Sequence, residues 1–279
     1  MAAMAACAPG GFQFAVASEV AQLGEDDAID ALQRIFSRSL VVEVDRSSRR
    51  YRLHPLIRQA APPSAAVRQR HAEIVLRRLW QWEQMPLESA PLIDEAEHSL
   101  MSLPAELVSA QIATLAGNLS RALGRLSQAW EFYERLSKQA LDASQRDWLE
   151  NSYGGQALIL KDWGRLDEAM ALHKKEEAIC LELGDRAGLQ RSYGNQALIL
   201  QDWGRLDEAM ALYNKEEVIC MELGDRAGLA YSFWSQGLLL RSQGNPGDAK
   251  QKLEAAHAIF TEVGLVRQRD AVRRAIAKA

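Results

Sequence analysis

One stretch of this sequence repeats itself almost without change. Residues 152–189 and 192–229 align without a gap at a spacing of 40 residues and differ at only six positions. The same spacing runs through four successive units in three ladders: Gly124, Gly164, Gly204 and Gly244; Ala129, Ala169, Ala209 and Ala249; Gly117, Ala157, Ala197 and Gly237. A fixed period of about 20–50 residues marks a repeat architecture, in which each unit buries its apolar faces only against its neighbours.

Each unit has the pattern of two helices. In residues 185–225, Asp185 is a good N-cap, and Gly204 supplies the left-handed conformation with which helices commonly end. Apolar residues recur at helical spacing in the first helix, namely Leu189, Tyr193, Ala197 and Leu200. The second helix, residues 206–223, is expected to turn Leu206, Ala209, Met210, Tyr213 and Val218 inward.

These positions carry a family resemblance. The pattern small-x6-Gly-x4-Ala-x3-aromatic, here Ala197, Gly204, Ala209 and Tyr213, resembles the tetratricopeptide repeat, and the spacing of 40 resembles its kinesin-light-chain-like variety. The resemblance implies a mainly α fold, an α-α superhelix over residues 105–279. The usual small residue late in the second helix is replaced by Glu176 and Glu216. A HEAT-type repeat is the structural alternative.

By the geometry of that family, the first helix of each unit lines a concave groove for a protein or peptide ligand. The resemblance therefore implies these partner-binding residues: Asn151, Lys161, Arg191, Asn195, Gln201, Tyr231, Trp234 and Arg241. An amide such as that of Asn195 offers a donor and an acceptor to a peptide main chain, and aromatic residues dominate binding hot spots. The alternatives are a solvated Asn195 and a Trp234 that only packs between helices.

The amino-terminal part has a different pattern. Residues 25–36 are expected to form a helix with an acidic first turn, residues 39–44 and 50–54 a β-hairpin, and residues 55–60 a second helix. Helix, hairpin and helix in so short a span are typical of a winged helix, so we expect a small winged-helix domain over residues 1–63. Pro62 and Pro63 mark its end. Helices over residues 65–82 and 88–103 are expected to bridge it to the array, giving a bridging segment of residues 64–104.

This stretch resembles the winged-helix segment of STAND-class regulatory ATPases, which couple a P-loop domain to a repeat sensor. The resemblance rests on Ala28-x3-Leu32-x2-Ile35-x3-Ser39-Leu40-Val41 and on Tyr51-Arg52-Leu53-His54-Pro55-Leu56-Ile57-Arg58. It implies that His54 touches a nucleotide diphosphate where a nucleotide domain exists, although Pro55 replaces the usual Asp. The alternative is a packed structural histidine.

Composition limits the partners. The formal net charge is -4, and residues 1–63 carry seven arginines against seven acids, although Arg46, Arg49, Arg50 and Arg52 gather at the predicted wing. This balance argues against nucleic acid as a partner. No run of 18 apolar residues is present, so we expect no membrane partner. Three cysteines without a C-x-x-C motif argue for reduced thiols, a cytoplasmic location and no metal site.

No catalytic pattern is present. The five histidines lie far apart, no H-E-x-x-H or G-x-S-x-G occurs, and no G-x-x-x-x-G-K-[ST] is present to hold a nucleotide. Glu176-Glu177 and Glu216-Glu217 recur with the repeat, which favours a solvated helix face. The sequence therefore predicts no enzyme, no catalytic residue and no cofactor. It predicts a protein-interaction scaffold or, as the alternative, the sensor half of a STAND-type switch, with a P-loop ATPase domain as a partner or as a domain lost from the chain.

Overall fold

The computed structural model describes residues 1–9, 11–45, 49–60, 62–79, 92–102, 109–142 and 145–277. The chain divides into two compact units, Met1–Trp148 and Leu149–Ala279, which are described separately. Among the described residues, no helix is long and apolar enough to cross a membrane.

The first unit begins with a small α/β arrangement. Its elements in chain order are α1 (Ala2–Ala6), β1 (Phe12–Gln13), α2 (Phe14–Ala21), α3 (Glu25–Phe36), β2 (Val41–Asp45), β3 (Arg50–Leu53) and α4 (Pro55–Ala60). The sheet has the order β1-β3-β2 with antiparallel pairing, so that Phe12 faces Tyr51 and Val41 faces Leu53. The predicted helices and hairpin strands are confirmed; the predicted turn at residues 46–48 lies outside the described residues. The winged-helix assignment and the limits of residues 1–63, 64–104 and 105–279 stay predictions.

Three elements of this unit were not predicted. Helix α1, strand β1 and helix α2 precede the predicted helix, and buried apolar residues fill them, including Ala6, Phe12, Val16 and Val20. The other described helices that lie within the unit are α5 (Ala65–Leu79), α7 (Leu92–Ser102), α8 (Ser109–Ala122) and α9 (Leu126–Asp142). Helices α8 and α9 form the first predicted repeat pair, in which the Tyr133 hydroxyl donates to Asn118 Oδ1 at 2.8 Å.

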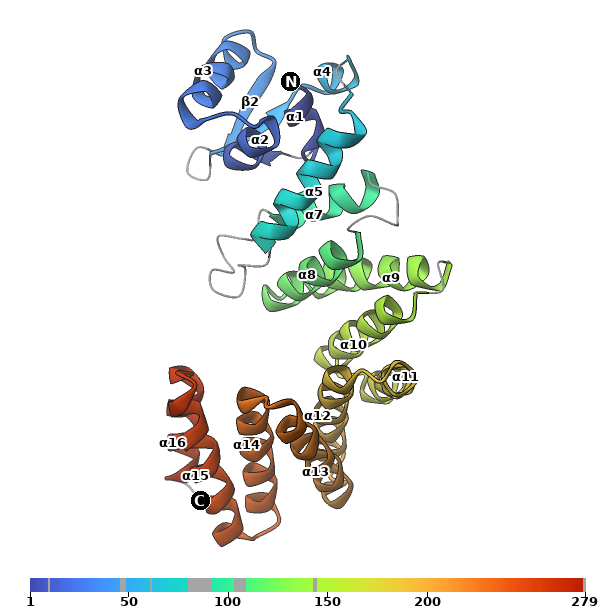
Figure 1. The fold of residues 1–279 in the computed structure, drawn as a ribbon, viewed down its shortest axis with the longest axis vertical. Helices are drawn as coiled ribbons and strands as arrows, with labels where there is room; N and C mark the ends of the chain where they lie inside the picture. Colours follow the sequence, from blue (N-terminus) through green and yellow to red (C-terminus); the bar gives the residue numbers. More distant parts are fainter. Residues whose placement is uncertain are drawn as a thin grey trace. The chain divides into compact units, whose positions relative to one another are not determined.

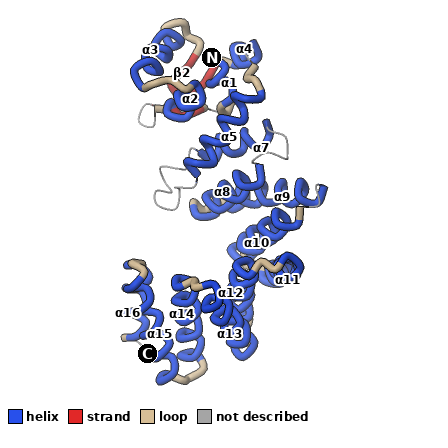
Figure 2. Tube along the Cα trace, in the orientation of Figure 1, coloured by secondary structure: helices blue, strands red, loops and turns tan. Residues whose placement is uncertain are grey.

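The second unit is a stack of helical pairs (Figures 1 and 2). Its helices are α10 (Arg146–Asp162), which starts at the end of the first unit, α11 (Leu166–Leu183), α12 (Arg186–Asp202), α13 (Leu206–Leu223), α14 (Arg226–Ser242), α15 (Pro246–Glu262) and α16 (Val266–Ile276). The chain is mainly α, as predicted, and this unit is a repeat array of the tetratricopeptide type.

The repeated glycines and aspartates end and begin these helices. Gly204 and Gly224 have φ values of 73° and 68°, which are left-handed conformations that only glycine adopts at no steric cost. Asp185 and Asp225 cap the next helices, since their Oδ1 atoms accept from the amides of Gly188 at 3.0 Å and Gly228 at 2.9 Å.

The crossing within each pair is close-packed. Ala197 and Ala209 are fully buried and lie in one cluster with Tyr213 and Leu239. Small side chains at a crossing let the two backbones approach closely. Val218, which was predicted to point inward, is 48% exposed, so that prediction was wrong. Cys180 and Cys220 are free and buried, as expected of core thiols.

Candidate binding face of the repeat array

The predicted binding residues lie on the first helices of three successive pairs. Asn151 and Lys161 are on α10; Arg191, Asn195 and Gln201 are on α12; Tyr231, Trp234 and Arg241 are on α14. Around α14, Tyr231, Trp234 and Arg241 lie within about 80° of one another, whereas Asn195 and Gln201 lie about 120° apart around α12, so the set covers a broad side of each helix. We call this set, with the surface between its members, the first-helix face.

Polar groups dominate the α10 and α12 part of this face. Asn151 and Arg191 are exposed, whereas Lys161, Asn195 and Gln201 are half-buried. The Arg191 guanidinium lies 3.4 Å from Glu150 Oε1, which links α12 to α10. Gln201 Oε1 accepts from the Tyr213 hydroxyl at 3.3 Å and so ties α12 to α13. Contacts within the array therefore hold the side chains of Arg191 and Gln201 in place.

The α14 end of the face is aromatic. Tyr231 and Trp234 stack with ring centroids 6.4 Å apart, and both meet the edge of Phe260 on α15. Gln268 on α16 donates to the Tyr231 hydroxyl at 2.8 Å. The indole N–H of Trp234 is buried and has no hydrogen-bond partner. Tyr231 itself is 41% exposed, so an aromatic surface ends the face.

The two repeated glutamates are the main correction to the sequence analysis. Glu176 and Glu216 are 3% and 9% exposed, so they do not belong to a solvated face. A Cβ added to Gly154 would lie 2.5 Å from Glu176 Oε1, and one added to Gly194 would lie 2.5 Å from Glu216 Oε1. Each carboxylate fills the space that a side chain on the neighbouring first helix would otherwise occupy.

The exchange of size continues in the next pair. Trp234 stands in the sequence place of Gly154 and Gly194, and Ala256 stands in the place of Glu176 and Glu216. Ala256 is fully buried in the cluster against which Trp234 packs. A large first-helix residue is thus matched by a small second-helix residue, and the reverse. Packing density is conserved while the surface of the face changes from glycine to tryptophan.

Burial shifts the pKa of two glutamates on or behind the first helices. Burial raises the pKa of Glu216 to about 7, and the nearby Asp225 carboxylate raises it further against the opposing effect of a Ser232 hydrogen bond. Burial also raises the pKa of Glu150, which the Arg191 cation partly offsets. His173 Nδ1 lies 2.7 Å from Glu176 Oε2 in the core.

Behind the face, a polar network repeats from pair to pair. The hydroxyls of Ser192 and Ser232 donate to the backbone carbonyls of His173 and Tyr213, at 3.1 and 3.3 Å. Gln196 and Gln236 donate to the second glutamate of each pair, Glu177 at 3.0 Å and Glu217 at 2.7 Å. These repeated hydrogen bonds favour one arrangement of neighbouring helices, while Gln196 Oε1 is buried without a hydrogen-bond partner.

His54 belongs to the first unit and is separate from this face. It lies between β3 and α4 and is exposed, so it is not packed in the interior. Its Nδ1 accepts from the Leu56 amide at 3.3 Å, and its carbonyl accepts from the amides of Ile57 and Arg58. In this structure His54 starts a short helix.

The eight predicted binding residues stay a prediction, and contacts on or behind the first helices add three residues that the sequence analysis did not place there: Glu150, Glu176 and Glu216. A sequence signal for the last two existed. Glycine inside a helix is unfavourable unless a close neighbour requires it, and Gly154 and Gly194 recur where a large residue stands opposite.

Comparison with known proteins supports the fold. A tetratricopeptide repeat model matches residues 190–215. No curated protein matches the sequence. Among solved structures, BtubC (BKLC) from P. vanneervenii is 18% identical with a TM-score of 0.58, over 90% of this chain and 92% of that one.

Two further structures bear on the two parts of the prediction. Kinesin light chain repeats from Podospora anserina are 16% identical with a TM-score of 0.53, over 68% of this chain and 95% of that one. A STAND protein with a tetratricopeptide repeat sensor from Pyrococcus horikoshii is 11% identical with a TM-score of 0.59. The latter match covers 94% of this chain and 50% of that one. At these identities the likeness concerns the fold alone.

Proposed function

We propose that this chain is a non-catalytic interaction scaffold that holds a peptide or protein on the first-helix face. The observation that carries the proposal is the contrast within α10, α12 and α14. One side of each helix is buried in packing, whereas the opposite side presents amide, cationic and aromatic groups to solvent. Such a surface matches an extended chain, which has a donor and an acceptor at every residue.

Each part of the face has a distinct role in this proposal. The amides of Asn151 and Asn195 bind the ligand main chain. Arg191, which Glu150 holds in place, faces a ligand carboxylate. Tyr231 and Trp234 give an apolar anchor. Aromatic and arginine anchors of this kind supply most of the energy of known interfaces. The buried, free thiols suit a reducing compartment, which supports the cytoplasmic location that we propose.

The test is capture of the partner from the native cell followed by affinity measurements on the purified pair. We expect Asn195→Ala to weaken binding about 5-fold or more, as loss of interface hydrogen bonds of about 1 kcal/mol does. The matched control is Asn214→Ala, which removes the same amide from an exposed position on α13. Equal affinity of the two variants would contradict the proposed face.

A second candidate function is the sensor half of a STAND-type nucleotide-driven switch. The fold similarity to the STAND protein over 94% of this chain favours it, and His54 is then the candidate nucleotide-sensing residue. The repeat face keeps its role as the ligand sensor in this reading. The chain would act on a P-loop ATPase domain, in another protein or in a longer form of this one.

Nucleotide titration tests the part of this candidate that the chain itself carries. The 279 residues lack the glycine-rich loop and lysine that cradle phosphates, so we expect no ATP hydrolysis and no affinity for ATP or ADP tighter than about millimolar. Calorimetry of ATP and ADP with the purified chain measures this. A micromolar constant would show that the chain holds a phosphate site by other means.

A further inference from the structure

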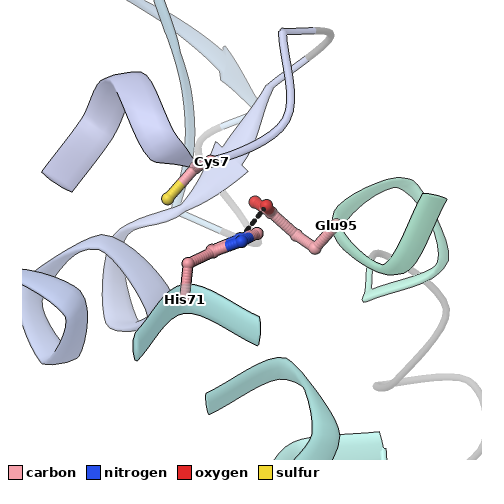
Figure 3. A group of neighbouring side chains, drawn as sticks. All are labelled: Cys7, His71 and Glu95. Carbon is pink, nitrogen blue, oxygen red and sulfur yellow. Dashed lines mark hydrogen bonds and ion pairs between the residues drawn. The ribbon is translucent and has the colours of Figure 1, made fainter. Parts of the chain in front are cut away.

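Three side chains from distant parts of the first unit meet in its interior. Cys7 follows α1, His71 lies on α5 and Glu95 lies on α7; Figure 3 shows the Glu95 carboxylate directed towards the His71 imidazole, with Cys7 beside them. One ligand atom from each lies within 4.8 Å of the others. The three residues are 0%, 1% and 1% exposed, so this cluster is closed to bulk water.

The hydrogen bonds of the cluster leave one acceptor unused. Glu95 Oε2 accepts from the Ala8 amide at 2.9 Å and lies 2.7 Å from His71 Nε2. Glu95 Oε1 is buried and has no hydrogen-bond partner. A buried carboxylate oxygen without a donor or a cation is costly, because the charge has lost its water. This oxygen is an observation independent of the grouping of the three residues.

The nearby cation does not fill this role. The Arg58 guanidinium donates to the backbone carbonyls of Ala5 at 2.7 Å, Cys7 at 2.6 Å and Ala8 at 3.2 Å. It therefore fixes the backbone on which Cys7 stands and makes no hydrogen bond to Glu95 Oε1.

We propose that Cys7, His71 and Glu95 form a zinc site. Thiolate, imidazole and carboxylate are the three ligand types that Zn²⁺ takes in proteins, at about 2.3 Å for sulfur and about 2.0–2.2 Å for nitrogen and oxygen. Zn²⁺ replaces the proton between His71 and Glu95 and the proton of the Cys7 thiol. One thiolate and one carboxylate balance its two charges, and Glu95 gains the cation that its burial requires.

The surroundings suit this role. Ser99 Oγ lies 3.0 Å from His71 Nδ1, so the Nδ1–H can donate to the hydroxyl and leave the Nε2 lone pair for the metal. A thiol must lose its proton to bind zinc, so affinity should rise with pH. Residues 7, 71 and 95 form no short motif, which is why the sequence analysis predicted no metal.

Zinc and cobalt titrations of the purified full chain test the site. After removal of metal with a chelator, we expect one Zn²⁺ per chain, and with Co²⁺ the near-ultraviolet band of thiolate-to-metal charge transfer. Cys7→Ser should remove that band and weaken zinc binding more than about 100-fold, beyond the loss that outer-shell changes cause. The control Cys220→Ser removes another buried thiol and should leave both intact.

Thermal unfolding separates loss of metal from loss of fold. Saturating Zn²⁺ should raise the midpoint of the parent chain, because a ligand that binds only the folded state stabilises it, and should leave the midpoint of Cys7→Ser unchanged. Absence of stoichiometric zinc in the parent would overturn the proposal. A cobalt band that survives in Cys7→Ser but disappears in Cys180→Ser would also overturn it, since Cys180 lies beside Glu150 and Asp185 in the other unit.

Discussion

At position 216 a carboxyl group is buried where tetratricopeptide-like repeats more often have a small residue. Its neighbour across the helix contact is Gly194, and no side chain there competes for the space. Burial disfavours ionisation of Glu216 in the folded state, and so contributes a pH dependence to the stability of the array.

The sign of the pH effect follows from the raised pKa. The pKa of Glu216 is about 7 in the folded chain, against about 4.3 in the unfolded chain. Between these values Glu216 binds more protons in the folded state, so its contribution to stability is most favourable below about pH 4.3 and declines as pH rises to about 7. We expect Glu216→Gln to gain on the order of 2–4 kcal/mol relative to the parent between pH 5 and pH 8.

Urea unfolding of the parent chain and of Glu216→Gln, each at about pH 5 and about pH 8, measures this gain in unfolding free energy. Taking the difference from the parent cancels the contribution of Glu150, whose pKa burial also raises. Glu254→Gln, at an exposed position on α15, is the matched control and should show no such gain. A difference that does not change with pH would mean that Glu216 is hydrated in the folded chain.

Position 209 tests burial at the helix crossing. Ala209 is 0% exposed, and a glutamate there places an unpaired charge between α12 and α13. Ala209→Glu should cost more than about 2 kcal/mol of unfolding free energy. The same substitution at Ala211, which is exposed on the same helix, should change it by less than about 0.5 kcal/mol. Equal urea midpoints of the two variants would show that position 209 is not a crossing.

The helix ladder and its small residues could be predicted because they repeat, but the side-chain pairing across it could not. Ala197, Ala209 and Tyr213 were placed correctly, since their spacing alone fixes their side of the helix. Glu176 and Glu216 were placed in solvent, since a charged residue is almost never buried without a partner. Only the distance to Gly154 and Gly194, which belong to other helices, shows where these carboxylates lie.

At the scale of the elements, the two helices of a pair approach so closely that one added methyl group would clash, as α14 and α15 show. A Cβ on Gly237 of α14 would lie 2.8 Å from Leu253 Cγ and 3.1 Å from the Ala249 carbonyl oxygen of α15. Helix propensity alone would make Gly→Ala stabilising by about 0.5–1 kcal/mol. The clash with a buried leucine and a backbone oxygen outweighs that gain.

Gly237→Ala should therefore destabilise the chain by about 1–3 kcal/mol, the usual cost of overpacking. Gly247→Ala, in the first turn of α15, is the control, because nothing lies within 4 Å of an added Cβ there. It should be neutral or stabilising. Thermal unfolding of the two variants measures the difference, and a Gly237→Ala chain as stable as Gly247→Ala would show that α14 and α15 are less closely packed.

The elements that were missed share a physical cause. Residues Ala3 to Ala6 of α1 are all buried, and the buried residues Phe14, Val16, Ala17 and Val20 of α2 leave little polar alternation. A periodic sequence pattern reveals a helix or strand when one side is apolar and the other is polar. An element that is apolar on both sides gives no such pattern. Helix α3 was predicted at its observed bounds, Glu25–Phe36, because its acidic first turn and apolar stripe differ clearly.

Over the whole chain, the central claim is that the first-helix face of Leu149–Ala279 binds a partner. The face is built from nearest-neighbour contacts, so each pair contributes its own part and the polar and aromatic ends can act on one extended ligand. The most direct measurement is site-specific photo-crosslinking in the native cell. A benzophenone amino acid replaces Asn195 on the face in one chain and Asn214 on α13 in another. We expect position 195 to crosslink a partner, identified by mass spectrometry, and position 214 to crosslink none. The same partner crosslinked from both positions, or from position 214 alone, would contradict it.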